Sequence, residues 1–275
     1  MNLENKEVKL VENLDSLTKN DIAIAFSGGV DSSLLLKIAC EKAAENQTKV
    51  YAYTIHTMLH PMEELELTRK LANEMGAIHK VIQVDELTDA GIEMNPVNRC
   101  YLCKKCMFTK LIEEASNIGV ETVIDGTNLD DTKVYRPGIQ ALKELGVISP
   151  LLLAEFSKSE VRALAAKYGI EVSERPSNPC MATRFPYGTR LVKEELDKVE
   201  KIEQFVRQMG FYNVRARIHD KLVRIEVDEK DIVLLLEKKA RIISLIKELG
   251  YDYISVDLEG FRSGSQDLHV DKGGN

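Results

Sequence analysis

Short apolar runs alternate with segments of helical periodicity along the first part of the chain. Runs rich in apolar and β-branched residues predict strands at residues 21–26, 49–57, 80–85 and 121–126. Apolar residues at helical spacing predict helices at residues 34–44, 62–75 and 158–168. Ser157 is the expected N-cap of the last of these helices, and Gly169 is expected to end it. Strands that alternate with helices form parallel sheets, so this part predicts an α/β domain with helices on both faces of its sheet.

The pattern changes after an irregular, proline-containing stretch at residues 174–188, ERPSNPCMATRFPYG. We place a domain boundary at its end, which gives expected domains of residues 1–189 and 190–275. In the second domain the pattern predicts helices at residues 193–209 and 232–249, and strands at residues 214–219, 222–227 and 253–258. These elements predict a smaller α+β domain that serves substrate binding, oligomerisation or both.

Composition places the chain among globular proteins. Of its 275 residues, 44% are hydrophobic and 29% are charged, and no run approaches the roughly 18 apolar residues that a membrane helix needs. The first residues, MNLENKEVKLVENL, contain no basic region followed by an apolar stretch, so we expect a cytoplasmic protein that does not use the membrane. The net charge of -7 gives no overall attraction to nucleic acid, which argues against a nucleic-acid partner.

A glycine-containing turn, Ser-Gly-Gly-Val-Asp-Ser-Ser at residues 27–33, joins the first predicted strand to the helix that follows it. Open α/β sheets bind ligands at the carboxyl ends of their strands, and a helix N-terminus attracts anions. Two glycines also let the backbone approach a phosphate closely. The turn lacks the ending of a Walker loop and the spacing of a dinucleotide fold. A plain glycine turn in which Asp or Ser caps a helix is the alternative interpretation.

The turn resembles the pyrophosphate-binding loop of the PP-loop ATP pyrophosphatase superfamily, matched at Ser27, Gly28, Gly29, Asp31 and Ser32. The sequence DGTN after the fourth strand and the segment PLLLAEFSKSEVRALAAKYGI resemble further motifs of that superfamily. The resemblance implies a PP-loop α/β domain that binds ATP and cleaves it between the α and β phosphates. It also implies that Asp31 is a catalytic residue near the Mg²⁺ that accompanies the pyrophosphate.

Four later motifs resemble the LarE-type ATP-dependent sulfur transferases: YRPG at residues 135–138, CMATRFPYGT at 180–189, VRARIH at 214–219 and DLEGFRSG at 257–264. This resemblance runs from about residue 10 to about residue 265. It implies a small-molecule nucleotide substrate, a pyridinium mononucleotide that is a precursor of the nickel-pincer cofactor. The substrate carboxylate attacks ATP and becomes an acyl-adenylate, and a sulfur nucleophile then displaces AMP and leaves a thiocarboxylate. The family also implies a homo-oligomer and a sulfide or other sulfur donor.

Arg215 and Arg217 stand two residues apart in a predicted strand, so both side chains leave the same face. We expect them to clamp a phosphate of the substrate, and Arg184 and Glu203 are weaker candidates for the same pocket. The alternatives are an exposed strand face that carries charge, for the two arginines, and a solvated helix residue, for Glu203.

Three of the five cysteines lie close together in PVNRCYLCKKCMF, residues 96–108. Some LarE-type proteins sacrifice the sulfur of a cysteine at the position of Cys180, and those members lack cysteines at the positions of Cys100 and Cys103. Because both are present here, the resemblance favours the branch in which Cys100, Cys103 and Cys180 hold a 4Fe-4S cluster with one open iron that carries hydrosulfide. Cys180 is then a catalytic residue as well as an iron ligand.

The other two cysteines are not expected to bind the cluster. On a helical wheel Cys106 lies about 120° from Cys100 and falls beside Lys110 and Glu113 on the polar side. Cys40 lies among apolar residues of the first helix and is expected to be buried.

Other interpretations of the cysteines stay open. They are a zinc site formed by Cys100, Cys103, Cys106 and Cys180, a redox pair at Cys100 and Cys103, and thiols without metal, with Cys180 as the sacrificial donor. The alternative functions are a tRNA thiolase, an ammonia-dependent synthetase and a nucleotide sensor without catalysis. The sequence offers no additional RNA-binding module for the first of these, and the second leaves the clustered cysteines unexplained.

Overall fold

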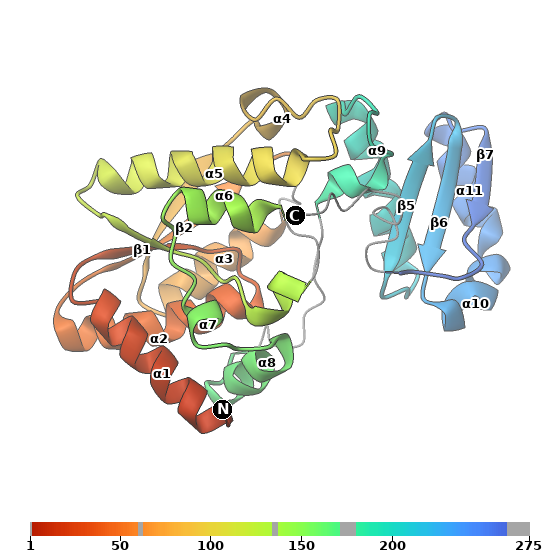
Figure 1. The fold of residues 1–275 in the computed structure, drawn as a ribbon. Helices are drawn as coiled ribbons and strands as arrows, with labels where there is room; N and C mark the ends of the chain where they lie inside the picture. Colours follow the sequence, from red (N-terminus) through yellow and green to blue (C-terminus); the bar gives the residue numbers. More distant parts are fainter. Residues whose placement is uncertain (1, 60–62, 134–136, 171–179, 263–275) are drawn as a thin grey trace. The chain divides into compact units, whose positions relative to one another are not determined.

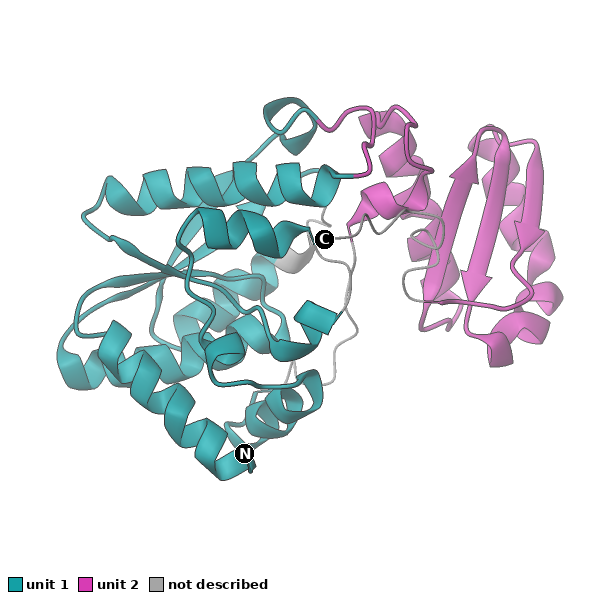
Figure 2. Cartoon of the chain, viewed as in Figure 1, with its two compact units in different colours: residues 1–91, 98–178 teal, residues 92–97, 179–275 magenta. Residues whose placement is uncertain are grey.

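The computed structural model describes residues 2–59, 63–133, 137–170 and 180–262. Two compact units make up the chain: residues 1–91 with 98–178, and residues 92–97 with 179–275 (Figure 2). The division at 178/179 precedes the boundary that we placed after residue 189, and the short segment 92–97 belongs to the second unit. Residues 135–136, 174–179 and 263–264 of the sequence motifs lie outside the described residues.

The first unit is built on a parallel four-stranded sheet in the order β3-β2-β1-β4. The strands are β1 (Ile22–Ala25), β2 (Val50–His56), β3 (Ile78–Gln83) and β4 (Thr122–Ile124). Ile22 pairs with Val50 on one side and Thr122 on the other, so the first strand of the chain lies in the middle of the sheet. The predicted α/β class and the parallel sheet are confirmed, although β4 is shorter than its apolar run.

Helices cover both faces of this sheet (Figure 1). They are α1 (Leu3–Leu17), α2 (Val30–Asn46), α3 (Glu63–Glu74), α4 (Glu86–Asp89), α5 (Arg99–Ser116), α6 (Gly138–Glu144), α7 (Pro150–Leu153) and α8 (Lys158–Lys167), with a 3-10 turn η1 (Leu129–Lys133). Successive strand residues point to opposite faces, so Ile22 and Ile24 join the apolar cluster under α1, α2 and α8, whereas Ala23 joins the cluster that contains Phe108 and Leu111 of α5. Two apolar clusters, one on each face of the sheet, therefore fix β1 from both sides.

Helix α8 begins as the sequence predicts. The Ser157 hydroxyl oxygen accepts a bond from the Glu160 N–H, and the Glu160 carboxylate accepts one from the Ser157 N–H at 2.8 Å. This capping box satisfies two amide groups that the start of a helix would otherwise leave unpaired. Gly169, with φ +70, follows the end of the helix.

The second unit holds a three-stranded sheet in the order β5-β6-β7. Strands β5 (Val214–His219) and β6 (Leu222–Val227) pair antiparallel, and β7 (Tyr253–Val256) pairs parallel to β6. Its helices are α9 (Lys193–Gln208), α10 (Ile232–Glu237) and α11 (Lys239–Glu248), with 3-10 turns η3 (Met181–Arg184) and η4 (Glu229–Asp231). The single helix predicted at 232–249 is wrong, because the chain breaks at Lys238 into α10 and α11. None of the described helices combines the length and apolarity that crossing a bilayer requires.

Candidate functional site

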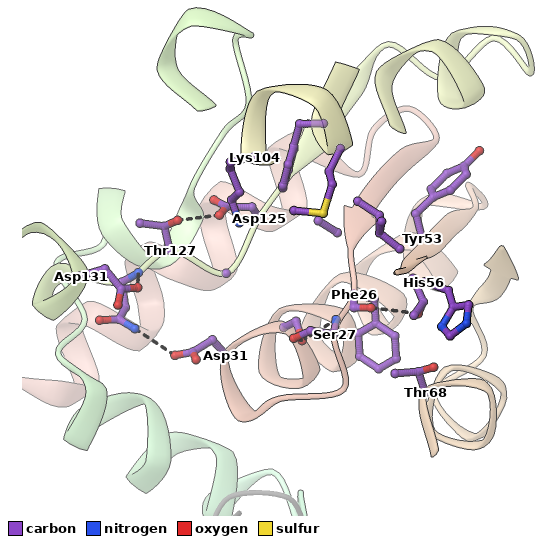
Figure 3. A pocket seen from close by; sticks show the side chains of 18 of the residues that line it. Phe26, Ser27, Asp31, Tyr53, His56, Thr68, Lys104, Asp125, Thr127 and Asp131 are labelled. Carbon is purple, nitrogen blue, oxygen red and sulfur yellow. Dashed lines mark hydrogen bonds between the residues drawn. The ribbon is translucent and has the colours of Figure 1, made fainter. Parts of the chain in front are cut away.

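A cavity of about 630 Å³ opens in the first unit where β1, β2 and β4 reach their carboxyl ends (Figure 3). Its walls come from the glycine turn after β1, the end of β2, the loop after β4, and residues of α3, α5 and α8. Because β1 lies between β2 and β4, the chain leaves the sheet in different directions at this edge, which is the usual ligand site of open α/β sheets.

Hydrogen bonds among its own serines shape the glycine turn. The Ser32 hydroxyl donates to the Gly29 carbonyl at 3.2 Å and accepts a bond from the Ser27 N–H at 3.3 Å. Gly28 has φ +69, and a Cβ there would lie 2.9 Å from Cγ2 of Thr68. Gly29 is the N-cap of α2 and provides no side-chain bond to the helix. The N–H groups of the first turn of α2 therefore remain directed at the loop. The turn has the shape of an anion-binding loop rather than that of a capped turn.

Asp31 lies between an amide and an ammonium group. Its Oδ1 accepts a bond from Nδ2 of Asn128 at 3.1 Å, and its Oδ2 pairs with Nζ of Lys158. The two side chains of the ion pair are 20% and 39% exposed, so water and ligands reach both groups. Carboxylate oxygens are the ligands that Mg²⁺ prefers, and the residues at this position therefore fit the cation that the sequence predicts.

The loop after β4 packs directly on the glycine turn. A Cβ at Gly126 would lie 3.1 Å from Cβ of Asp31, so a larger residue would have to push the two segments apart by a few tenths of an ångström. Asp125 is buried, and its two carboxylate oxygens accept bonds from the hydroxyls of Thr127 and Ser149, both at 2.5 Å. Through these bonds Asp125 stabilises the conformation of the loop. The DGTN motif thereby positions Asn128 against Asp31.

The same loop fixes the start of α8. The Lys158 N–H donates to Oδ2 of Asp130 at 2.7 Å, and the Asn128 N–H donates to Oδ2 of Asp131 at 3.0 Å. Lys158 stands within the segment PLLLAEFSKSEVRALAAKYGI, but the sequence pattern predicted no role for it. The signal that would have assigned one is its position as the first residue of a capped helix, where a side chain can extend beyond the helix end.

The remainder of the cavity has an apolar wall and several polar side chains. The apolar part comes from Phe26, Tyr53, Ile55, Leu65, Met107 and Phe108. Thr54 on β2 contacts both neighbouring strands. Its hydroxyl donates to the carbonyl of Phe26, just after β1, at 2.9 Å, and it lies 2.8 Å from Nε2 of His79 on β3. Burial lowers the pKa of His79. Lys104 also reaches the cavity from α5 (Figure 3). It stands within the cysteine-rich stretch, where the sequence pattern predicted no role for it.

Two buried ion pairs lie in the second unit. Arg184 is fully buried and bonds Glu203 through Nε–Oε1 at 2.8 Å and Nη2–Oε2 at 2.9 Å. Arg217 bonds Glu226 in the same two-pronged way, at 3.0 and 2.9 Å. Burial opposes ionisation of Glu203, but the bonds and charge of Arg184 outweigh it and lower the pKa of that carboxyl. The alternative of a solvated Glu203 is therefore wrong.

Arg215 differs from the other two arginines. It is only 5% exposed, which also rules out an exposed charged strand face for this position. Its Nη1 donates to the Val214 carbonyl at 2.7 Å, and its guanidinium lies 4.9 Å from the centre of the Phe261 ring. Among the described residues no carboxylate comes within ion-pair distance of it, and burial, followed by the charge of Arg184, lowers the pKa of Arg215 to about 10. A buried guanidinium of this kind suits an anionic ligand.

The cysteines are divided between the two units. Cys100 is exposed and Cys103 is half-buried, one turn apart at the start of α5 in the first unit. Cys180 is half-buried and precedes η3 in the second unit. Within the described ranges, no three His, Cys, Asp or Glu side chains are arranged to hold a metal ion.

Cys106 corrects the helical-wheel interpretation. It packs with Met107 and Ile112 against the apolar cluster of β1 and α5 rather than on the polar side of the helix, and burial raises the pKa of its thiol. Cys40 packs against the other apolar cluster, as the sequence predicts, and burial raises the pKa of its thiol to about 12.

The fold and the cavity together define a nucleotide-binding α/β protein whose first strand leads into a phosphate loop. The sequence matches the PP-loop domain family over residues 2–186. The chain therefore belongs to the PP-loop ATP pyrophosphatase family, and it is an enzyme of that family.

Three relatives show how far the similarity extends. A pyridinium-3,5-bisthiocarboxylic acid mononucleotide synthase of Lactiplantibacillus plantarum is 36% identical over 95% of this chain and 94% of its own. An uncharacterised protein of a Synechocystis species is 37% identical over 88% and 90% of the two chains. A tRNA-specific 2-thiouridylase of Rickettsia bellii is 24% identical over 58% of this chain and 53% of its own.

Proposed function

We propose that this protein is an ATP-dependent sulfurtransferase that converts a carboxylate of a pyridinium mononucleotide into a thiocarboxylate, with AMP and pyrophosphate as the other products. One observation carries the proposal: the chain places a phosphate loop and the Asp31–Lys158 pair on one cavity and is similar, over 95% of its length, to a synthase named for a bisthiocarboxylic acid mononucleotide. The thiouridylases of tRNA share much less of the chain, so a tRNA substrate is the second candidate.

In this proposal ATP occupies the cavity of the first unit. The apolar wall that includes Tyr53 and Met107 receives the adenine ring, and the loop at Ser27, Gly28, Gly29 and Ser32 receives the phosphates. Asp31 faces Mg²⁺, and Lys158 exchanges its bond with Asp31 for one with a phosphate oxygen. The exchange is inexpensive because both side chains are partly exposed.

The first chemical step requires correct positioning of the two substrates and stabilisation of negative charge, and it requires no nucleophile from the protein. An oxygen of the substrate carboxylate bonds to the α-phosphorus, the bond from that phosphorus to the β-phosphate oxygen breaks, and pyrophosphate leaves with the electron pair. Lys158 and the N–H groups at the start of α2 stabilise the charge that collects on the departing pyrophosphate. A sulfur nucleophile then attacks the acyl carbon, and AMP leaves.

The mononucleotide phosphate is proposed to bind at the arginines of the second unit. Arg215 has the strongest support, because its charge has no carboxylate partner among the described residues. Arg184, Arg217 and Glu203 remain proposed members of this pocket, although each of these side chains is already engaged in a buried ion pair.

We propose Cys100, Cys103 and Cys180 as ligands of a 4Fe-4S cluster. The chemistry of the donors supports the proposal, because thiolates are the usual ligands of iron-sulfur clusters and Cys100 and Cys103 stand one helical turn apart at the start of α5. Cys106, in contrast, packs against the apolar cluster that contains Phe108. When bound, such a cluster with an open iron supplies a sulfide ligand. Sacrifice of the Cys180 sulfur is the alternative source.

The test is an anaerobic reaction of the full-length protein with ATP, sulfide and the pyridinium mononucleotide, in which AMP and thiocarboxylate are quantified. We expect the two products in equal amounts and no effect of added tRNA. AMP that appears only with tRNA present, or none with any substrate, would overturn the proposal.

Iron analysis of four serine variants tests the cluster separately. Cys100→Ser, Cys103→Ser and Cys180→Ser are expected to lose bound iron, whereas Cys106→Ser, the matched control on the same helix, is expected to keep it. Wild-type protein without iron, together with loss of one H₂S from Cys180 after turnover, would favour the sacrificial route instead.

A further inference from the structure

The short segment 92–97 inserts a buried asparagine into the second unit (Figure 2). Asn95 is fully buried, and its backbone has φ +45, a left-handed conformation that asparagine tolerates better than most residues. Its Nδ2 lies 3.4, 3.1 and 2.9 Å from the carbonyl oxygens of Ala182, Phe185 and Pro186. The two N–H donors of one side-chain amide therefore serve the turn that follows Cys180, and the Phe185 and Pro186 carbonyls are the closer acceptors.

Backbone bonds reinforce this attachment. The Gly188 N–H donates to the Asn95 carbonyl at 3.1 Å, and the Leu191 N–H donates to the Glu93 carbonyl at 2.7 Å. The segment 92–97 and residues 188–191 thus lie side by side. From this segment the Asn95 side chain extends into the turn at residues 180–186.

Two buried arginines also hydrogen-bond to backbone carbonyls of the same turn. Nη1 of Arg184 donates to the Cys180 carbonyl at 3.2 Å, and Nη1 of Arg217 donates to the Thr183 carbonyl at 2.5 Å. Both guanidinium groups are themselves fixed by two-pronged bonds to carboxylates. The turn at residues 180–186 is therefore bound by its own Arg184 and by side chains from two other elements, Arg217 of β5 and Asn95 of the segment 92–97. Asn95 contacts its far end, at Phe185 and Pro186.

We propose that Asn95 is a positioning residue for Cys180. It fixes the backbone of the turn that presents the Cys180 thiol. The inference rests on the proposed function only for the step that it affects, which is the transfer of sulfur. It assigns no contact between Asn95 and substrate.

Two substitutions separate the amide donors of Asn95 from its backbone conformation. Asn95→Asp keeps the size and the left-handed tendency but removes both N–H donors and directs a carboxylate at three carbonyl oxygens. Asn95→Gly keeps the backbone conformation and removes the side chain. Asn98→Ala is the matched control, because Asn98 is exposed and makes no capping bond at the start of α5.

Amide hydrogen exchange of the full-length protein is the first readout. The N–H groups of Thr183, Phe185 and Gly188 are expected to exchange about tenfold faster in both Asn95 variants, the factor that corresponds to about one lost hydrogen bond. Amides of α2 in the first unit report whether the protein remains folded, and they and the Asn98→Ala variant should match the wild type. Exchange of the turn at the wild-type rate in both Asn95 variants would overturn the proposal.

The two half-reactions are the second readout. Thiocarboxylate formation should fall by about tenfold in both variants, whereas pyrophosphate release and the KM for ATP stay within about twofold of the wild type. An equal fall in both reactions would contradict a role limited to Cys180. If the wild type forms no thiocarboxylate, the proposed function fails, and the exchange experiment still decides whether Asn95 holds the turn.

Discussion

An ion pair beside the cavity of the first unit and an ion pair in the core of the second unit differ sharply in burial. In the first unit Lys158 and Asp31 are 39% and 20% exposed beside an open cavity. In the second unit Arg184 and Glu203 are 0% and 1% exposed and have several further hydrogen bonds. A partly exposed pair can exchange partners when a ligand arrives, whereas a buried pair loses too much if either charge is left alone. Residues of similar chemistry are thus suited to ligand exchange at the first pair and to structural support at the second.

The largest effect is expected from breaking a buried pair. Glu203→Gln leaves the Arg184 charge without its carboxylate and should lower the free energy of unfolding of the second unit by about 3–5 kcal/mol. Urea denaturation followed by a probe in the second unit measures this change. Glu194→Gln, on the exposed face of the same helix, should change the value by less than about 0.5 kcal/mol. A loss for Glu203→Gln as small as that of the control would contradict the contrast between the units.

Removal of the exchangeable cation is expected to affect catalysis rather than stability. Lys158→Ala should lower kcat/KM for pyrophosphate release by about 100-fold, since one charge on the transferred phosphates is lost. Steady-state release of pyrophosphate gives this number. Lys167→Ala, at the other end of α8 and 64% exposed, is the control and should retain wild-type activity. Equal activity of the two variants would show that Lys158 does not meet the phosphates.

The glycine turn offers a smaller and sharply controlled test. Gly28→Ala places a methyl group 2.9 Å from Thr68 and should reduce pyrophosphate release by about tenfold. Gly146→Ala imposes the same left-handed strain, at φ +71, where no atom lies within 4 Å of the new Cβ. It should lower stability by about 1 kcal/mol without changing catalysis. A similar loss of activity in both variants would remove the turn from the site.

The sequence predicted the parts of this protein that depend on near neighbours. The strands, the phosphate loop and the Ser157 cap are each set by a few consecutive residues, and they appear at or within a few residues of their predicted places; β3 begins at Ile78 instead of Lys80, and β4 is only Thr122–Ile124. Helix α1 was missed, because its apolar residues are spaced among charges and gain their core position from α2 and α8. The break at Lys238 was missed because the apolar pattern continues through it.

The site was predictable only where a motif was contiguous. Asp31 meets Lys158 across 127 positions of the chain, and Asn95 meets Phe185 across 90, so neither contact leaves a local pattern. Cys106 shows the same limit in another way. A helical wheel ranks the faces of one helix, but the strands packed against α5 decide which of them is buried.

The smallest expected effect concerns the pH dependence of stability at two buried carboxyl groups, one in each unit. Glu86 in the first unit is fully buried without a cation partner among the described residues, and burial raises its pKa, whereas Arg184 lowers the pKa of Glu203. A raised pKa in the folded protein gives stability at low pH that is lost as pH rises through that pKa. Glu86→Gln cannot ionise, so its stability relative to the wild type should increase as pH rises above the ordinary pKa of a glutamate.

The same measurement on Glu203→Gln should show the opposite trend. The lowered pKa of Glu203 gives stability above the pKa of the unfolded chain, so the deficit of this variant should shrink as pH falls through the folded pKa. Urea denaturation at several pH values gives both curves. Parallel curves for the two variants would show that the carboxyl groups do not differ in their electrostatic surroundings.

Oxygen transfer tests the central claim most directly. If the substrate carboxylate attacks the α-phosphorus of ATP, a pyridinium mononucleotide labelled with ¹⁸O in that carboxylate must pass one labelled oxygen to AMP when sulfur displaces it. Mass spectrometry of the AMP formed in a single anaerobic turnover is therefore expected to show one ¹⁸O atom per AMP. AMP that contains no label, while thiocarboxylate still accumulates, would contradict adenylation of the carboxylate.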